Sequence, residues 1–122
     1  MLSDACYNHF DISLDTAPLT GGTTTVDSLE MGVPVVTMRG PAMHQRISHA
    51  IVSHVGLGDL SAETPEGFVD AAVGLANDLD RLTDLKRTLR DRLSASALCD
   101  GPGFAKGFAA TMAELAGLPK AE

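Results

Sequence analysis

The stretch "LDTAPLTGGTTTVDSLEMGVPVVTM", residues 14–38, places a short turn rich in glycine and threonine between two apolar segments. Residues 10–14, "FDISL", alternate apolar and polar side chains, which is the period of a half-buried strand. Residues 23–31 are expected to form a short helix, with Gly32 directly after its last turn. Residues 34–38, "PVVTM", form an apolar run that is typical of buried parallel strands. The order strand, turn, helix, strand predicts a compact βαβ unit with a right-handed crossover.

The rest of the chain is predicted to be mainly helical. Thr64 followed by Pro65 is typical of a helix start, with an N-cap and a proline in the first turn. An amphipathic surface helix is predicted further on, because charged residues separate a stripe of leucines at Leu79, Leu82, Leu85, Leu89 and Leu93. Residues 101–103, which hold two glycines and a proline, are expected to break regular structure before a final helix over residues 104–115.

Two strands are too few for a stable sheet. Parallel strands need neighbours on both sides and helices on both faces, so a pair of them does not make a core. We therefore expect either weak strands hidden later in the chain, with residues 57–61 as a candidate, or strands contributed by sequence upstream of Met1. The predicted fold class is α/β, with a parallel sheet flanked by helices and incomplete in this chain.

Composition and charge exclude several classes of partner. The chain has 122 residues and a formal net charge of −7, which argues against a duplex nucleic-acid surface and against an anionic membrane. A phosphate ligand is not excluded, because the amides at a helix start supply local positive potential. Cys6 and Cys99 are too few and too far apart for a disulfide framework or a zinc knuckle. The N-terminus also lacks the basic segment followed by an apolar segment that is typical of a signal peptide, so we expect a cytoplasmic protein.

The turn at residues 21–24 is the best candidate for a binding site. Gly21 and Gly22 stand at the end of a predicted parallel strand and before a helix, where small residues let backbone N–H groups approach a phosphate. Thr23 and Thr24 add hydroxyl donors, and Asp27 is placed one turn later to accept hydrogen bonds from ribose hydroxyls. The motif matches neither the dinucleotide fingerprint nor a Walker loop. A tight turn whose threonines only cap the helix therefore stays open as the alternative.

No metal site is expected. His44, His49 and His54 are five residues apart, about 140° of helical rotation per step, so no two share a helix face as zinc ligands at i and i+4 do. Arg39 and Arg46 flank the loop after the second strand, and either could pair with a phosphate. Solvated surface arginines are the favoured interpretation.

Several segments together resemble one family. They are "DISLDTAPLTGGTTTVDSLEMGVPVVTMRG" (residues 11–40), "QRISHAIVSHVGLGDL" (45–60) and "FVDAAVGLANDLDRLTDLKRTLRDRL" (68–93). In this order and spacing they resemble the C-terminal end of the O-linked N-acetylglucosamine transferase and SPINDLY family, over residues 7–115. Members of that family are inverting, metal-independent glycosyltransferases with two Rossmann-like domains (GT-B type), usually preceded by tetratricopeptide repeats.

The resemblance implies a place for this chain within such an enzyme. Residues 1–122 would be part of the second Rossmann-like domain, which holds the nucleotide sugar. Within it, residues 1–63 would contain the βαβ unit and the following helix, and residues 64–122 the C-terminal helices. The missing part of the enzyme would contain the acceptor site and most catalytic groups, so no catalytic residue is assigned here.

The resemblance also implies roles for the turn. Gly21, Gly22, Thr23 and Thr24 would contact the diphosphate, and Asp27 would bind the ribose. The implied donor is UDP-N-acetylglucosamine and the implied acceptors are Ser or Thr hydroxyls of proteins, with no metal or other cofactor. The chain departs from the family at Gly22, where some members carry histidine, and at a second position, Glu30, where an aromatic residue is frequent.

Three alternatives remain from the sequence. The SPINDLY branch transfers fucose from a GDP-sugar, so the chain would then be a fragment of a GDP-fucose-using transferase. A second alternative is a non-catalytic truncated or split module that assembles with a partner through an exposed sheet edge. The third is an unrelated α/β phosphate-binding domain. In the leading interpretation we expect the chain alone to bind weakly and to be inactive in transfer.

Overall fold

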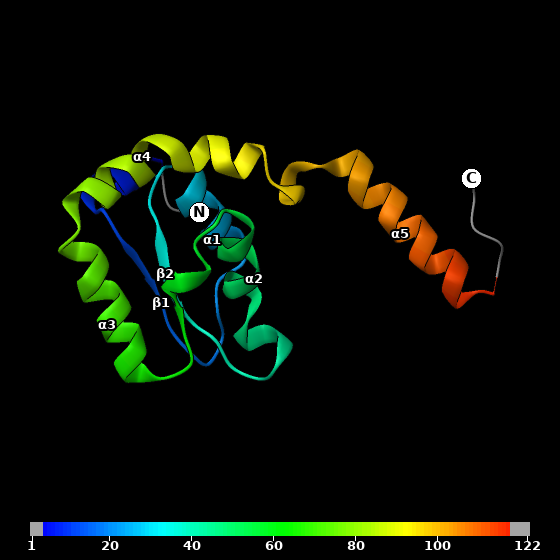
Figure 1. Ribbon diagram of the computed structural model, residues 1–122, viewed down its shortest axis with the longest axis horizontal. Helices are drawn as coiled ribbons and strands as arrows, with labels where there is room; N and C mark the ends of the chain where they lie inside the picture. The colour runs from blue at the N-terminus through cyan, green and yellow to red at the C-terminus, as the bar shows by residue number, and fades with distance from the viewer. Residues whose placement is uncertain (1–3, 118–122) are drawn as a thin grey trace.

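A three-stranded parallel sheet forms the centre of the computed structural model, which describes residues 4–117 (Figure 1). The strands are β1 (Ser13–Asp15), β2 (Val35–Met38) and β3 (Ser61–Ala62), in the order β1-β2-β3. Both neighbouring pairs are parallel, so the carboxyl ends of all three strands lie at one edge of the sheet. This arrangement confirms the predicted α/β class with a parallel sheet and flanking helices.

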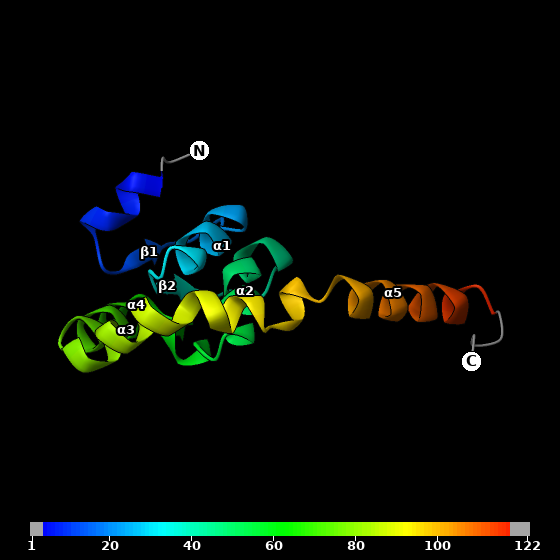
Figure 2. The ribbon, with the colours of Figure 1, turned by 90° about the horizontal axis from the view of Figure 1, so that it is seen from above.

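Helices surround the sheet. Within residues 4–117 the α-helices are α1 (Thr23–Glu30), α2 (Ile47–His54), α3 (Pro65–Ala76), α4 (Leu79–Ser94) and α5 (Gly101–Leu115). Short 3₁₀ helices lie at η1 (Asp4–His9), η2 (Met43–Gln45), η3 (Gly58–Leu60) and η4 (Ala97–Cys99). Helices α1, α2 and α3 pack against β2, and α4 crosses over α1 and α3. Helix α5 extends away from the sheet (Figures 1 and 2), and its apolar residues Phe104, Phe108, Met112 and Leu115 are exposed.

The core is aliphatic and is centred on β2. Val35 and Val36 are almost inaccessible to solvent, as expected for the middle strand of a parallel sheet. Helix α4 confirms the predicted amphipathic helix, because Leu85, Leu89 and Leu93 are buried against this core. Leu79, the first residue of the predicted stripe, is instead exposed, because it begins the helix beyond the edge of the core. Each fully buried leucine contributes about 1.5–3 kcal/mol of transfer free energy.

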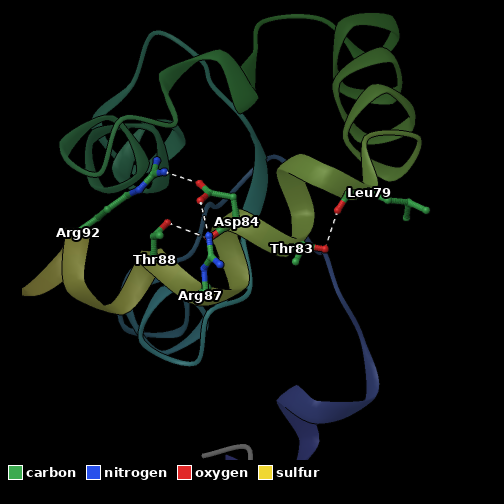
Figure 3. A network of polar contacts seen from close by, with 6 residues as sticks. All are labelled: Leu79, Thr83, Asp84, Arg87, Thr88 and Arg92. Carbon is green, nitrogen blue, oxygen red and sulfur yellow. Dashed lines mark hydrogen bonds and ion pairs between the residues drawn. The ribbon is translucent and has the colours of Figure 1, made fainter.

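The outer face of α4 carries polar contacts that follow the helix. Asp84 accepts a hydrogen bond from Arg92 (Nη2 to Oδ2, 2.9 Å) and forms an ion pair with Arg87 (3.5 Å), as Figure 3 shows. The hydroxyls of Thr83 and Thr88 donate to carbonyls one turn earlier in the same helix. Exposed ion pairs contribute about 0–1 kcal/mol each. The buried leucines, rather than these charges, therefore hold α4 in place.

Two sequence predictions about the strands need correction. The first strand is Ser13–Asp15 rather than residues 10–14, because it pairs only with β2, whose ladder begins after Pro34, a residue without an N–H group. The weak strand expected in residues 57–61 is β3, which begins at Ser61 after the 3₁₀ helix η3. Two residues carry too little pattern to be recognised, and pairing with β2 determines this strand.

The helix termini were predicted with mixed success. The N-cap at Thr64 is confirmed, since its Oγ1 accepts from the N–H of Gly67 at 3.1 Å, and Pro65 begins α3. The predicted break at residues 101–103 is wrong, because these residues form the first turn of α5. The carboxylate of Asp100 caps that turn by accepting from the N–H of Gly103 at 2.9 Å, and a proline is favourable there.

None of the helices in residues 4–117 has the length and apolar character needed to cross a membrane.

Candidate functional site

The glycine-threonine turn joins β1 to α1 at the carboxyl edge of the sheet. Asp15, the last residue of β1, lies opposite Thr37 of β2. Its carboxylate accepts from Thr37 Oγ1 (2.7 Å) through one oxygen and from the N–H of Gly21 (2.9 Å) through the other. Thr37 is fully buried, so this carboxylate ties the turn to a fixed point in the sheet.

A second buried side chain holds the other half of the turn. Ser48, in the first turn of α2, donates from its Oγ to the carbonyl of Gly21 at 2.9 Å. The same Oγ lies 2.7 Å from Thr25 Oγ1, within a buried contact. In a trans peptide the carbonyl and the following N–H point in opposite directions. Because Ser48 fixes the Gly21 carbonyl toward α2, the N–H of Gly22 points away from α2.

Three backbone N–H groups at the start of α1 are left without an acceptor. Gly22 is the N-cap residue, and its carbonyl accepts from the N–H groups of Thr25 and Val26, both at 3.1 Å. Within residues 4–117 the N–H groups of Gly22, Thr23 and Thr24 donate to no acceptor. Such groups carry the positive end of the helix dipole. The arrangement is suited to an anion.

The threonines do not cap α1, which corrects the alternative in which capping was their only role. No side chain makes a cap hydrogen bond at this helix start. Thr23 and Thr24 are exposed, and Asp27 is half-buried one turn further along the same side of α1. The opposite side is buried in the core and carries Thr25, Ser28 and Leu29. The five predicted residues therefore lie together on one rim, while their roles toward a ligand stay predictions.

The residues that support this rim were not recognised in the sequence. Asp15 and Thr37 could have been paired from the parallel alignment of the two strand ends, since both are polar residues at the carboxyl end of their strands. Ser48 gives no comparable signal. It is 27 residues from Gly21 and reaches it only because α2 packs beside α1.

A separate cleft of about 570 Å³ lies at the same edge of the sheet. It is lined by residues that follow β2 and β3 and by residues at the start of α2, namely Arg39, Gly40, Pro41, Arg46, His49 and Glu63. The guanidinium of Arg39 lies 3.1 Å from the Glu63 carboxylate and 3.4 Å from His49 Nε2. Arg46 donates from Nε to the carbonyl of Gly40 at 3.0 Å. Arg46 is exposed and Arg39 is partly exposed, which agrees with their interpretation as surface arginines, and both line this cleft.

The remaining candidates have structural roles or none. His44 is exposed in η2, and its carbonyl accepts from both the N–H and the hydroxyl of Thr20, each at 3.1 Å. In the part of the chain that the structure describes, no group of three or more His, Cys, Asp or Glu residues could hold a metal ion.

His49 is predicted to titrate below its ordinary value of 6.5. Burial lowers the pKa of His49, the charges of Arg39 and Arg46 lower it further, and Glu63 opposes them. The unfolded chain then binds this proton more readily than the folded chain. Stability that is present above pH 6.5 is therefore lost as the pH falls through 6.5 toward the folded pKa. NMR titration of the imidazole checks the pKa, and His49→Gln should reduce the pH dependence of unfolding. A midpoint at or above 6.5 would contradict this prediction.

Fold and rim define the chain as part of an α/β protein with a candidate anion-binding turn at the carboxyl edge of a parallel sheet. The model of glycosyl transferase family 41 matches residues 8–108, and the chain belongs to this family. This result confirms the resemblance on which the sequence prediction depended.

Individual relatives agree with the family. The chain is 49% identical over 98 residues to a probable UDP-N-acetylglucosamine–peptide N-acetylglucosaminyltransferase SPINDLY of Eustoma exaltatum subsp. russellianum. It is 45% identical over 101 residues to the protein of the same description from Arabidopsis thaliana. These matches cover 80% and 83% of the chain but only 11% of each relative. The chain thus spans about a tenth of the length of these relatives.

A solved structure supports the fold. A mutant of the Thermobaculum terrenum O-GlcNAc transferase superposes with a TM-score of 0.71 at 41% sequence identity. The match covers 75% of this chain and 18% of that chain. The α/β fold of this chain is therefore that of a GT-B-type transferase segment.

Proposed function

We propose that this chain is the nucleotide-sugar-binding portion of a protein O-glycosyltransferase. The donor would be UDP-N-acetylglucosamine and the acceptors Ser or Thr hydroxyls of proteins, and the enzyme would be cytoplasmic. One observation carries the proposal: side chains hold both the N–H and the carbonyl of Gly21, and the N–H groups of the next three residues have no acceptor within residues 4–117. Membership in glycosyl transferase family 41 supports the same function.

The rim would stabilise the leaving group of the transfer. In this reaction an acceptor hydroxyl attacks the anomeric carbon, its proton passes to a base, and the bond to the nucleoside diphosphate breaks. Negative charge then develops on the diphosphate. The amides of Gly22, Thr23 and Thr24 and the two threonine hydroxyls would bind this charge without a metal ion. Asp27 would orient the nucleotide by accepting from ribose hydroxyls.

The base and the acceptor site would come from the rest of the enzyme. No residue of this chain is proposed as catalytic, so the isolated chain should not transfer sugar. Transfer of labelled N-acetylglucosamine to a peptide by the purified chain would contradict this part of the proposal.

Asp27→Ala is expected to weaken UDP binding about tenfold, because hydrogen bonds to a charged carboxylate are lost. Isothermal titration with UDP, GDP and inorganic phosphate measures the affinity and the base preference. Glu30→Ala is the matched control, since it removes the same charge from an exposed position in α1 that lies outside the rim.

The measured affinities test whether the rim binds a nucleotide and which base it prefers. A preference for UDP over phosphate, lost in Asp27→Ala only, supports the assignment. A preference for GDP would indicate a GDP-sugar donor instead. Equal weakening of UDP binding by both variants would contradict a nucleotide site at this rim.

A further inference from the structure

We propose that the cleft lined by Arg39, Arg46 and His49 binds an oxyanion, a carboxylate or a phosphate, separately from the rim that would hold the nucleotide. This proposal does not depend on the proposed function. It follows from the position, the charge and the hydrogen-bonding state of the cleft.

The cleft is distinct from the rim in space. Its walls are the segments after β2 and β3 and the start of α2, and none of the residues from Gly21 to Asp27 lines it. A volume of about 570 Å³ exceeds what one phosphate or carboxylate group requires. The cleft can therefore admit an oxyanion together with part of the molecule that carries it.

The charge of the lining is positive within a chain of net charge −7. Arg39 forms an ion pair with Glu63, which balances one positive charge. Arg46 forms no ion pair with any residue in 4–117, and its Nε donates to a neutral carbonyl. Its guanidinium charge is thus left for a ligand, and arginine binds carboxylates and phosphates through two parallel hydrogen bonds.

The unsatisfied groups of the lining are donors. Arg39 Nε and His49 Nδ1 are buried and have no hydrogen-bond partner. An arginine Nε always carries a proton. In His49, Nε2 lies 3.4 Å from an Nη of Arg39, which can only donate, so in the neutral ring the proton belongs on Nδ1. The buried side-chain groups of the lining that have no partner are therefore donors. An oxyanion supplies acceptors alone, which favours it over a neutral or cationic ligand.

NMR titration of the ¹⁵N-labelled full chain tests the proposal. Inorganic phosphate is added at neutral pH in exchange for chloride, so that the ionic strength stays constant. Aspartate with both backbone ends blocked is titrated in a parallel experiment as the carboxylate probe. We expect saturable shifts at Gly40, Arg46 and the arginine Nε–H resonances. Arg46→Gln should weaken this binding at least about tenfold. Arg90→Gln, the matched control, removes the same charge from an exposed site on α4 and should leave the affinity unchanged.

Saturable binding that Arg46→Gln weakens and Arg90→Gln does not supports the site, and the tighter probe identifies whether phosphate or carboxylate is its ligand. Absence of saturable shifts in the cleft, or equal weakening by both variants, overturns the proposal. Titration with UDP keeps the two proposals apart, because it should shift the amides of residues 22–27 and retain its affinity in Arg46→Gln. Failure at the cleft with UDP bound at the rim would refute only the oxyanion site. Failure at the rim with phosphate bound at the cleft would refute only the nucleotide site.

Discussion

Gly32→Ala should destabilise the fold by about 2–5 kcal/mol, the sum of backbone strain and overpacking. Gly32 follows α1 with φ of +79°, a conformation that costs an L-residue about 1–2 kcal/mol. An added Cβ would also lie 2.6 Å from the carbonyl oxygen of Lys86 in α4. That oxygen belongs to the backbone of a helix held by buried leucines, so it cannot move away without shifting α4. Urea unfolding followed by circular dichroism measures the loss.

Gly56→Ala is the matched control for this variant. Gly56 follows α2 with the same φ of +79°, but a Cβ there would meet nothing within 4 Å. We expect it to cost only the backbone strain, about 1–2 kcal/mol. The difference between the two variants then isolates the close approach of the end of α1 to α4. Equal destabilisation would show that α1 and α4 are not in the close contact that the structure places at Gly32.

The contact at Gly32 bears on the candidate site as well as on stability. Helix α1 carries the rim at its start and meets α4 at its end, so the packing against α4 fixes the direction of the helix. The Ser28 hydroxyl strengthens this end by donating to the carbonyl of Val33 at 3.0 Å. A shift of α4 would therefore tilt the three free amides as well as weaken the core.

Local sequence signals predicted the βαβ unit because each signal acts over a few residues. A glycine after α1, a proline before β2 and the apolar run of β2 itself each determine the backbone conformation of the residues next to them. The position of Gly32 directly after the last turn of α1 and the N-cap at Thr64 are confirmed for this reason. Strand β3 is only a weak candidate in the sequence because its two residues form a strand through pairing with β2. In that pairing Ser61 lies beside Thr37, which is 24 residues earlier in the chain.

The supports of the site depend on contacts between distant segments. The sequence predicted Gly21 to Thr24 and Asp27 as a group because they are consecutive around one helix start. It could not place Ser48 against the Gly21 carbonyl, nor bring Arg39 and Arg46 to one cleft, since these contacts require α2 to be packed against the sheet. Side-chain convergence of this kind has no period or spacing that a sequence pattern could reveal.

Gly21→Ala should weaken UDP binding at least about tenfold if the rim is the nucleotide site. A Cβ on Gly21 would lie 2.6 Å from Thr25 Oγ1 and 2.9 Å from Thr24 Oγ1. Thr25 Oγ1 cannot retreat, because it is buried and is held 2.7 Å from Ser48 Oγ. The turn must therefore move, which breaks the bonds that fix the Gly21 peptide and misdirects the free amides. We expect a loss of at least about tenfold in affinity and about 1–3 kcal/mol in stability.

Gly22→Ala separates crowding of the turn from a general intolerance of side chains there. A Cβ on Gly22 would have Ile47 Cγ2 at 3.8 Å as its nearest contact, which is an ordinary van der Waals distance. The cost should stay within about 1 kcal/mol, and UDP should still bind, because the bonds of Asp15 and Ser48 to Gly21 are untouched. Calorimetric titration with UDP, at a temperature where Gly21→Ala is still folded, compares the affinities of the two variants. Full binding by Gly21→Ala, or equal loss in both variants, would show that the fixed Gly21 peptide does not direct the amides to the nucleotide.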